Sequence, residues 1–241
     1  MGAILAAAEE HVLSLIRVAL CALYLSCWVA PAYAAFEVGG GGAYTTSLGG
    51  AFSAGVESAE AVWFNPAAVA RLRIPRLTST HGVLFAALPE SPTIHSGAVA
   101  WPGGWGTAQV GYSTLRADEW SESSLLLGVA RSVHSRLSLG MQIRANGWRS
   151  GPYARGHWLA NFGGLYEVGW LTPHIYMRTS FVLSNLSAAQ ASENGRPTGQ
   201  RARSYTVGMQ LVSTGRTLLL DVEGLDDEWQ LRAGYEAQVR D

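Results

Sequence analysis

Residues 137–144 read Leu-Ser-Leu-Gly-Met-Gln-Ile-Arg, and they alternate without exception between an apolar side chain and a polar or small one. A two-residue period is the pattern of a β-strand that has one apolar and one polar face. The same period recurs from about residue 94 onward, in residues 157–170, 175–184, 204–211, 217–223 and 229–239. The sequence therefore predicts an all-β protein with about ten or eleven strands.

The connections between these segments alternate between short turns and longer polar links. Short turns are expected at residues 102–104, 133–135, 172–173 and 213–215, and longer links at 87–93, 117–121, 147–156, 187–202 and 224–228. Transmembrane barrels have tight periplasmic turns and longer external loops. The order predicts a transmembrane antiparallel up-and-down β-barrel, with residues 187–202 as its most exposed external loop.

The two faces of the predicted strands differ in charge and in aromatic content. The apolar faces are nearly free of charge, and tryptophans gather near strand ends, as in the aromatic girdles of membrane barrels. The polar faces carry both signs of charge, which we expect to pair inside the barrel: Arg136, Arg144, Glu167, Arg178, Asp221, Glu223, Arg232 and Glu236. A soluble, secreted β-sandwich that binds a ligand is the alternative, because its strands alternate in the same way.

Residues 1–34 are interpreted as a signal peptide. An apolar run, Val18–Ala30, precedes Pro31-Ala32-Tyr33-Ala34-Ala35, an A-x-A cleavage pattern best cut after residue 34. An uncleaved anchor helix is the alternative, although the run is short for a membrane span. Cys21 and Cys27 both lie in this segment, so the exported chain would have no disulfide. The expected location is the bacterial outer membrane.

Composition and motifs argue against an enzyme and against a nucleic-acid partner. The 241 residues include 28 Gly, 9 Trp and 9 Tyr with only 15% charged residues, a composition that favours β structure. All 17 basic residues are arginines and the net charge is −1, so no broad basic surface is expected. No nucleophile elbow, zinc-protease motif or phosphate loop occurs, and no two of the six histidines have metal-ligand spacing. We predict no catalytic residue, metal or cofactor.

The region before the regular strands alternates less clearly. Ala43–Ser53 is expected to form a strand, Val56–Leu72 a helical or irregular stretch, and Arg76–Ala86 another strand. The chain is thus predicted to consist of the signal peptide, an N-terminal strand and plug-like segment over residues 35–75, and barrel strands over residues 76–241.

An ordered set of motifs in residues 39–72 resembles the opening of the FadL/PorV-type outer-membrane barrels. It comprises Gly49-Gly50-Ala51-Phe52, then Glu57-Ser58-Ala59-Glu60-Ala61, then Trp63-Phe64-Asn65-Pro66-Ala67. The resemblance implies a barrel of about fourteen strands with a plug or constriction formed near Trp63, Phe64, Asn65, Pro66 and Ala67. Taken alone, Asn65-Pro66-Ala67 would be an ordinary turn at the start of a helix.

The resemblance also implies a function without a chemical step. FadL-type members pass long-chain fatty acids or other small hydrophobic compounds, whereas PorV-type members serve type IX protein secretion and surface attachment. The implied partners are outer-membrane lipid, a hydrophobic solute or a secreted protein cargo, and the barrel insertion machinery. The chain departs from the family in having three or four strands fewer and in ending at Arg240-Asp241 without a terminal aromatic residue. A truncated member, a smaller relative and a barrel closed by association all fit these departures.

Overall fold

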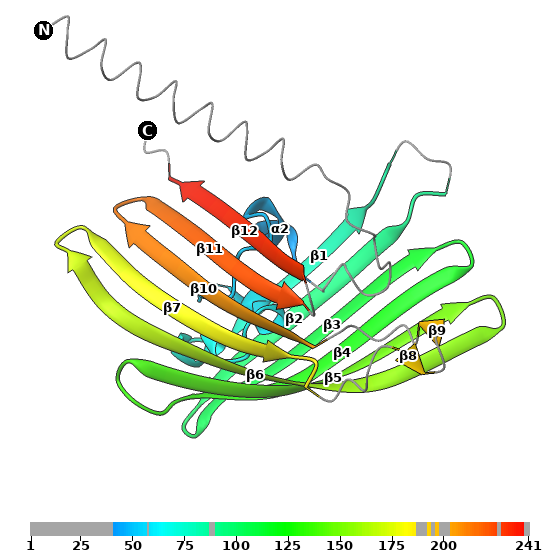
Figure 1. Cartoon of the computed structure of the whole chain (residues 1–241), viewed down its shortest axis with the longest axis horizontal. Coiled ribbons are helices and arrows are strands. Elements are labelled where there is room, and N and C mark those ends of the chain that lie inside the picture. Colours follow the sequence, from blue (N-terminus) through cyan, green and yellow to red (C-terminus); the bar gives the residue numbers. More distant parts are fainter. Residues whose placement is uncertain are drawn as a thin grey trace, which may run out of the picture. The chain divides into compact units, whose positions relative to one another are not determined.

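The computed structural model describes residues 41–56, 58–86, 90–186, 192–193, 196–197, 203–225 and 228–238. The predicted signal peptide and most of the predicted loop 187–202 lie outside these residues. Ten long strands make up most of the described chain (Figure 1). They are β1 (Arg76–Val83), β2 (Thr93–Gly103), β3 (Gly106–Ala117), β4 (Trp120–Ser132), β5 (Leu137–Ser150), β6 (Tyr153–Thr172), β7 (Ile175–Ser184), β10 (Ser204–Ser213), β11 (Arg216–Leu225) and β12 (Glu228–Ala237).

These ten strands form one antiparallel sheet in which neighbours in the sequence are neighbours in space. The order runs from β1 to β7 and continues through β10 to β12, while the two-residue strands β8 (Ser192–Glu193) and β9 (Arg196–Pro197) pair only with each other. The predicted all-β, antiparallel up-and-down arrangement is confirmed. Within the described residues no pairing joins β1 to β12, so the sheet is not closed into a barrel.

Three of the predicted long links are wrong, because the strands beside them continue further than expected. Only residues 118–119 separate β3 from β4, only 151–152 separate β5 from β6, and only 226–227 separate β11 from β12. In the β5–β6 hairpin Ser150 is paired with Tyr153, so polar residues that suggested a loop extend the two strands. At this end of the sheet the links that remain long are residues 84–92 and 185–203.

The strands are staggered in one sense across the sheet. Successive backbone partners of Trp229 in β12 lead to Trp101, one residue beyond the last β2 residue that pairs with β1. The path passes through Gly224, Tyr205, Leu183, Phe162, Met141, Val129 and Ala108. Strand β12 therefore continues away from β1 along the strand direction. A stagger of this kind is what tilted strands require in a closed barrel.

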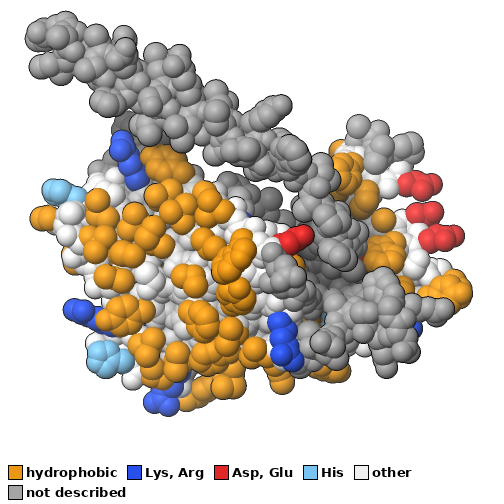
Figure 2. All heavy atoms as spheres, viewed as in Figure 1, with side chains coloured by type: hydrophobic (Ala, Val, Ile, Leu, Met, Phe, Trp, Pro, Cys, Tyr) orange, Lys and Arg blue, Asp and Glu red, His pale blue; other side chains and the backbone are white. Residues whose placement is uncertain are grey.

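The two faces of the sheet have the reverse of the usual polarity. On β5 the polar Gln142 is 4% exposed, whereas its neighbour Ile143 on the other face is 55% exposed. The exposed face, here called the outer face, is apolar along most of the strands, and Figure 2 shows hydrophobic side chains spread over β7 and β10–β12. The buried inner face is rich in Ser, Thr, Asn and Gln. The other described sheet has only two strands of two residues each, which is too small to be the second layer of the β-sandwich alternative.

The inner face packs against residues 41–72, here called the interior segment. It contains a five-residue helix, α2 (Ala43–Ser47), and two 3₁₀ turns, η1 (Ala59–Trp63) and η2 (Ala68–Arg71). The helical or irregular stretch predicted for residues 56–72 is confirmed, but the strand predicted for residues 43–53 is wrong. No described helix has the length and hydrophobicity to cross a lipid bilayer.

A buried carboxylate explains why the start of the interior segment is helical. Glu60, itself 5% exposed, accepts hydrogen bonds from the backbone N–H groups of Gly42 and Thr45 and from the Thr45 hydroxyl. These groups would otherwise be unsatisfied donors at the first turn of a helix. Gly49 and Gly50 then adopt positive φ angles of 63° and 73°, which end the helix and turn the chain.

Candidate functional site

Five glycines on the inner face make room for the interior segment. A β-carbon added at any of them would lie within 3.0 Å of a residue of that segment. The contacts join Gly111 to Trp63, Gly140 to Pro66, Gly163 to Asn65, Gly208 to Ser53 and Gly234 to Leu48. Because these glycines come from β3, β5, β6, β10 and β12, the interior segment is fitted against strands from both halves of the sheet.

The Asn65-Pro66-Ala67 element is the most tightly enclosed part of this contact. Asn65 is fully buried; its side-chain amide donates to the carbonyl oxygens of Ser53 at 2.7 Å and Gly164 at 3.2 Å. Its Oδ1 accepts from the Ala67 N–H at 2.9 Å, which forms an Asx turn. The Pro66 carbonyl accepts from the Gln109 side chain of β3 at 3.0 Å. The element is therefore a turn, and it also joins the interior segment to β3 and β6 of the sheet. The ten-stranded sheet is called the wall from here on.

Asp221 on β11 anchors the middle of the interior segment. This 1%-exposed carboxylate accepts hydrogen bonds from the backbone N–H groups of Phe52 and Ser53, each at 2.9 Å, and from the Ser53 hydroxyl at 2.6 Å. The same hydroxyl lies 2.7 Å from the hydroxyl of Ser180 on β7. Hydrogen bonds to a charged acceptor are stronger than neutral ones, so Asp221 holds this part of the segment firmly.

The first residues of the interior segment contact strands near both edges of the sheet, β2 and β12. The Gly41 carbonyl accepts from Ser96 on β2 at 3.3 Å, and the Tyr44 hydroxyl donates to Glu236 on β12 at 2.9 Å. Residues 41 and 44 can be no more than about 11 Å apart along the chain. The sheet is therefore curved so strongly that β2 and β12, which lie near its opposite edges, contact the same short stretch of chain.

Aromatic and cationic groups meet at the centre of the interior. The guanidinium of Arg144 on β5 lies 5.3 Å from the centre of the Trp63 ring, a cation–π arrangement, and donates to the Trp63 carbonyl at 3.5 Å. Phe52 packs edge-to-face against Tyr44 and Phe64, with ring centres 5.5 Å and 5.9 Å apart. The interior segment therefore has an apolar core of its own inside a polar wall.

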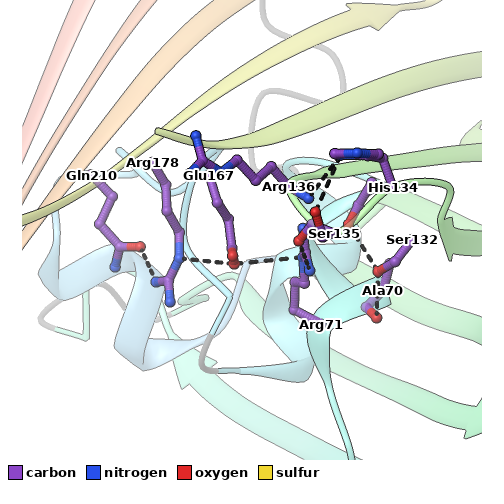
Figure 3. A network of polar contacts seen from close by, with 10 residues as sticks. Ala70, Arg71, Ser132, His134, Ser135, Arg136, Glu167, Arg178 and Gln210 are labelled. Atoms are coloured by element: carbon purple, nitrogen blue, oxygen red, sulfur yellow. Dashed lines mark hydrogen bonds and ion pairs between the residues drawn. The ribbon is translucent and has the colours of Figure 1, made fainter. Parts of the chain in front are cut away.

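A chain of polar contacts lies near the turn at residues 133–136 (Figure 3). Glu167 on β6 lies between Arg71 of the interior segment, at 3.5 Å, and Arg178 of β7, at 3.7 Å. Arg178 also donates to Gln210 of β10 at 2.8 Å. Arg71 donates to the Ser135 carbonyl at 3.0 Å. The network joins the end of the interior segment to three strands and a turn.

Seven of the eight charged residues predicted for the polar faces lie on the inner face of the sheet, and some of their partners differ from those expected. Arg232 pairs with Glu223 on the neighbouring strand, as the alternation of charges suggested. Asp221 and Glu236, in contrast, accept from the interior segment. Arg136 was expected on the polar face of β5, but it is exposed in the turn before that strand, since β5 begins at Leu137.

Sequence reasoning missed the inner glycines, Glu60 and Arg71 as parts of this site. The alternation in residues 137–144 placed Gly140 on the polar face of its strand, but nothing indicated that it marks a contact with another segment. A signal was present, because glycine inside a strand often marks a place where another backbone approaches closely. Glu60 and Arg71 lie in the segment without regular alternation, where facing directions cannot be read from a period.

The arrangement supplies packing and polar anchoring of the interior segment. Within the described residues no group of three or more His, Cys, Asp or Glu side chains is placed to hold a metal ion. The inner carboxylates are occupied by hydrogen bonds or ion pairs from within the chain. No family model, curated protein or solved structure matches the chain.

Proposed function

We propose that this chain is an outer-membrane β-barrel protein of FadL type that passes small hydrophobic compounds, with the interior segment as its gate. The observation that carries the proposal is the inverted sheet, whose polar side chains face inward and whose apolar side chains face outward. In water such a face would be a very large exposed apolar patch, of a size that soluble monomers rarely have. Against lipid the same face is the favourable one.

The exposed tryptophans support the same environment. Trp101, Trp105, Trp158, Trp170 and Trp229 have exposed fractions between 57% and 68%. Trp105 lies in a turn, and Trp101, Trp170 and Trp229 lie within three residues of a strand end. This is where an interfacial aromatic girdle is expected. Trp120 and Trp148 instead stack on each other, with ring centres 5.3 Å apart.

Closure of the sheet by pairing β1 with β12 is part of this proposal. Ten strands in up-and-down order leave the first and last strands antiparallel, like the nine pairs already formed. The strands are staggered, as closure of tilted strands requires, and the interior segment contacts strands near both edges of the sheet, at Ser96 of β2 and Glu236 of β12. In lipid the unpaired backbone groups of two free edges would each cost several kcal/mol, which favours closure.

A gate at this position would control a hydrophobic route through a polar wall. The interior segment presents an apolar cluster that includes Phe52, Val62, Trp63 and Val69. A solute that moved along this cluster would avoid the polar inner face. Because the segment is fitted against five glycines, passage requires it to shift away from some of them.

The test is uptake of a fatty acid into proteoliposomes by a chain whose gate can be locked. Ser53 and Ser180, whose hydroxyl oxygens are 2.7 Å apart, are replaced by cysteines in a background where Cys21 and Cys27 are serines. Their proximity is compatible with a disulfide between the interior segment and β7. We expect uptake in the reduced protein, its loss on oxidation and its return on reduction.

The matched control is a disulfide within the wall. Ser124 of β4 and Asn146 of β5 are cross-strand partners whose side chains are 2.7 Å apart, so the cysteine pair S124C/N146C joins only two neighbouring strands. Uptake should persist when this control is oxidised. Equal uptake in empty liposomes and in those containing the protein would contradict the transport proposal.

A further inference from the structure

Side chains on the outer face of β3, β4 and β5 change from apolar to charged along the strands. The charged end is the end of the sheet at which residues 84–92 and 185–203 connect the strands. Residues directly paired across these strands share a face, and each such row lies two residues from the next along the strands. From the middle of the outer face toward that end the rows are Val110–Leu127–Ile143, Tyr112–Leu125–Ala145, Thr114–Ser123–Gly147 and Arg116–Ser121–Arg149. The sequence of rows is therefore aliphatic, aromatic, small and polar, then cationic.

The row spacing gives the distance of the cationic row from the centre of the proposed membrane. Three steps of two residues cover about 20 Å along the strands. With a tilt of about 40°, this distance corresponds to about 15 Å along the membrane normal. Half the height of the apolar band of a membrane barrel is about 12 Å. If Leu127 lies at the membrane centre, Ser121 lies about 15 Å from it, and the tilt places one arginine backbone about 3 Å nearer the centre and the other about 3 Å farther out. The two arginines then lie between the edge of the hydrocarbon and the headgroup phosphates.

These two arginines also line one hollow. Arg116 and Arg149 flank Ser121 on the same face, so their backbones are two strand spacings, or about 10 Å, apart. The hollow has a volume of about 540 Å³. It is lined by Glu90, Ser91, Arg116, Ala117, Asp118, Trp120, Ser121 and Arg149.

We propose that this hollow binds the phosphate of a membrane-lipid headgroup, with Arg116 and Arg149 as its ligands. The inference rests on the proposed membrane location. The planar guanidinium group donates two parallel hydrogen bonds to phosphate oxygens, and two such groups on either side of a serine hydroxyl match a tetrahedral anion. The acyl chains of the lipid then lie along the apolar rows that contain Tyr112 and Leu127.

The other residues of the hollow fit a headgroup better than a bare anion. Glu90 and Asp118 would repel a second negative charge, but they can accept hydrogen bonds from an ammonium or hydroxyl group next to the phosphate. Trp120 also lines the hollow, and its indole donates to Glu122 at 3.0 Å. Aromatic rings of this kind favour the membrane interface.

Native mass spectrometry of the delipidated protein in detergent, titrated with phosphatidylglycerol, tests the inference. The variants are Arg116→Gln, Arg149→Gln and the double variant. Arg131→Gln is the control, because Arg131 is an exposed arginine of the outer face near the other end of β4 and is not among the residues lining the hollow. We expect the most tightly retained lipid to bind roughly fivefold more weakly for each arginine removed from the hollow, and Arg131→Gln to leave its retention unchanged.

Three outcomes would overturn the inference. Equal retention of phosphatidylglycerol by the double variant and the unchanged protein would exclude the arginines as ligands. Equal retention of diacylglycerol, which has no phosphate, would exclude phosphate recognition. Complete displacement of the lipid by millimolar inorganic phosphate would assign the site to a soluble anion. If the protein inserts into bilayers but shows any of these results, only this inference fails; if it does not insert, the proposed function fails first.

Discussion

The inner and outer faces of strand β5 are built from alternate residues of one sequence, yet they obey opposite rules. Gln142, Arg144 and Asn146 are buried on the inner face, whereas Met141 and Ile143 are exposed on the outer face. In a soluble sheet the apolar set would be the buried one. The difference shows that the polar side chains are covered inside the molecule and that the apolar ones are not.

The interior segment supplies those inner partners. It brings backbone carbonyl and N–H groups to Gln109, Arg144 and Asp221, and it buries its own apolar side chains among the inner glycines. The outer face has no corresponding described segment, and in the proposed function lipid covers it. Substitutions that change one face at a time test this contrast.

The largest effect is expected at two adjacent glycines of β6. A β-carbon at Gly163, on the inner face, would lie 2.1 Å from Asn65 Oδ1, whereas one at Gly164, on the outer face, would have no neighbour closer than 3.8 Å. Gly163→Val should lower the free energy of unfolding by about 4 kcal/mol, through overpacking and loss of the Asn65 hydrogen bonds. Gly164→Val should change it by less than about 1 kcal/mol. Denaturant titration in detergent measures both, and equal effects would contradict the assignment of the faces.

An arginine placed in the middle of the outer face tests the lipid environment. Leu127→Arg should lower the free energy of unfolding from a bilayer by about 3 kcal/mol, because a charge at the membrane centre is poorly solvated. Val133→Arg, in the turn after β4, should cost at most about 1 kcal/mol near the interface. Unfolding in lipid vesicles measures the difference. Two equally tolerated arginines would show that water, not lipid, covers Leu127.

Removing the charge of Asp221 should loosen the interior segment without changing the outer face. Asp221→Asn weakens three hydrogen bonds from Phe52 and Ser53, so we expect a loss of about 2 kcal/mol. Hydrogen exchange of the Phe52 and Ser53 amides should accelerate. Glu223 lies on β11 like Asp221, but it pairs with Arg232 of β12. Glu223→Gln should therefore leave the Phe52 and Ser53 amides protected. Unchanged protection in both variants would remove Asp221 from the anchoring role.

The smallest effect is expected at the ion-pair network. Arg71→Gln removes an ion pair to Glu167 between side chains that are about one-fifth exposed, so it should cost less than about 1 kcal/mol. Its neighbour Arg73, exposed and two residues away, provides the control variant Arg73→Gln. Proteolysis of the interior segment should quicken for Arg71→Gln and not for Arg73→Gln. Identical digestion of the two variants would mean that the network does not hold the end of the segment.

The regular part of the fold could be predicted from the sequence because a period of two residues assigns each side chain to a face. Leu137 to Arg144 showed this directly, and the facing of Glu167, Asp221 and Arg232 followed from the same rule. The period does not say where a strand stops, which is why polar residues near Ser150 and Tyr153 were expected in a loop. It also does not say which face is buried, since barrel and sandwich alternate alike.

The interior segment was harder to predict because its structure depends on distant residues. The helix at Ala43–Ser47 exists beside Glu60, and Asn65 is satisfied by Ser53 and by Gly164 of β6. None of these contacts follows from a local pattern. The motif around Asn65 indicated that the region was special, but the glycines that receive it became recognisable only once the strands were placed side by side.

The most direct test of the account is a nitroxide scan of β5 in proteoliposomes. Spin labels at residues 139, 141 and 143 should collide often with oxygen, which concentrates in the hydrocarbon, and rarely with a water-soluble nickel complex. A label at residue 142 should be shielded from both, and one at residue 133 should meet the nickel complex. Labels at 139, 141 and 143 that meet the nickel complex as often as the label at 133 would show that the outer face lies in water, and the account would be wrong.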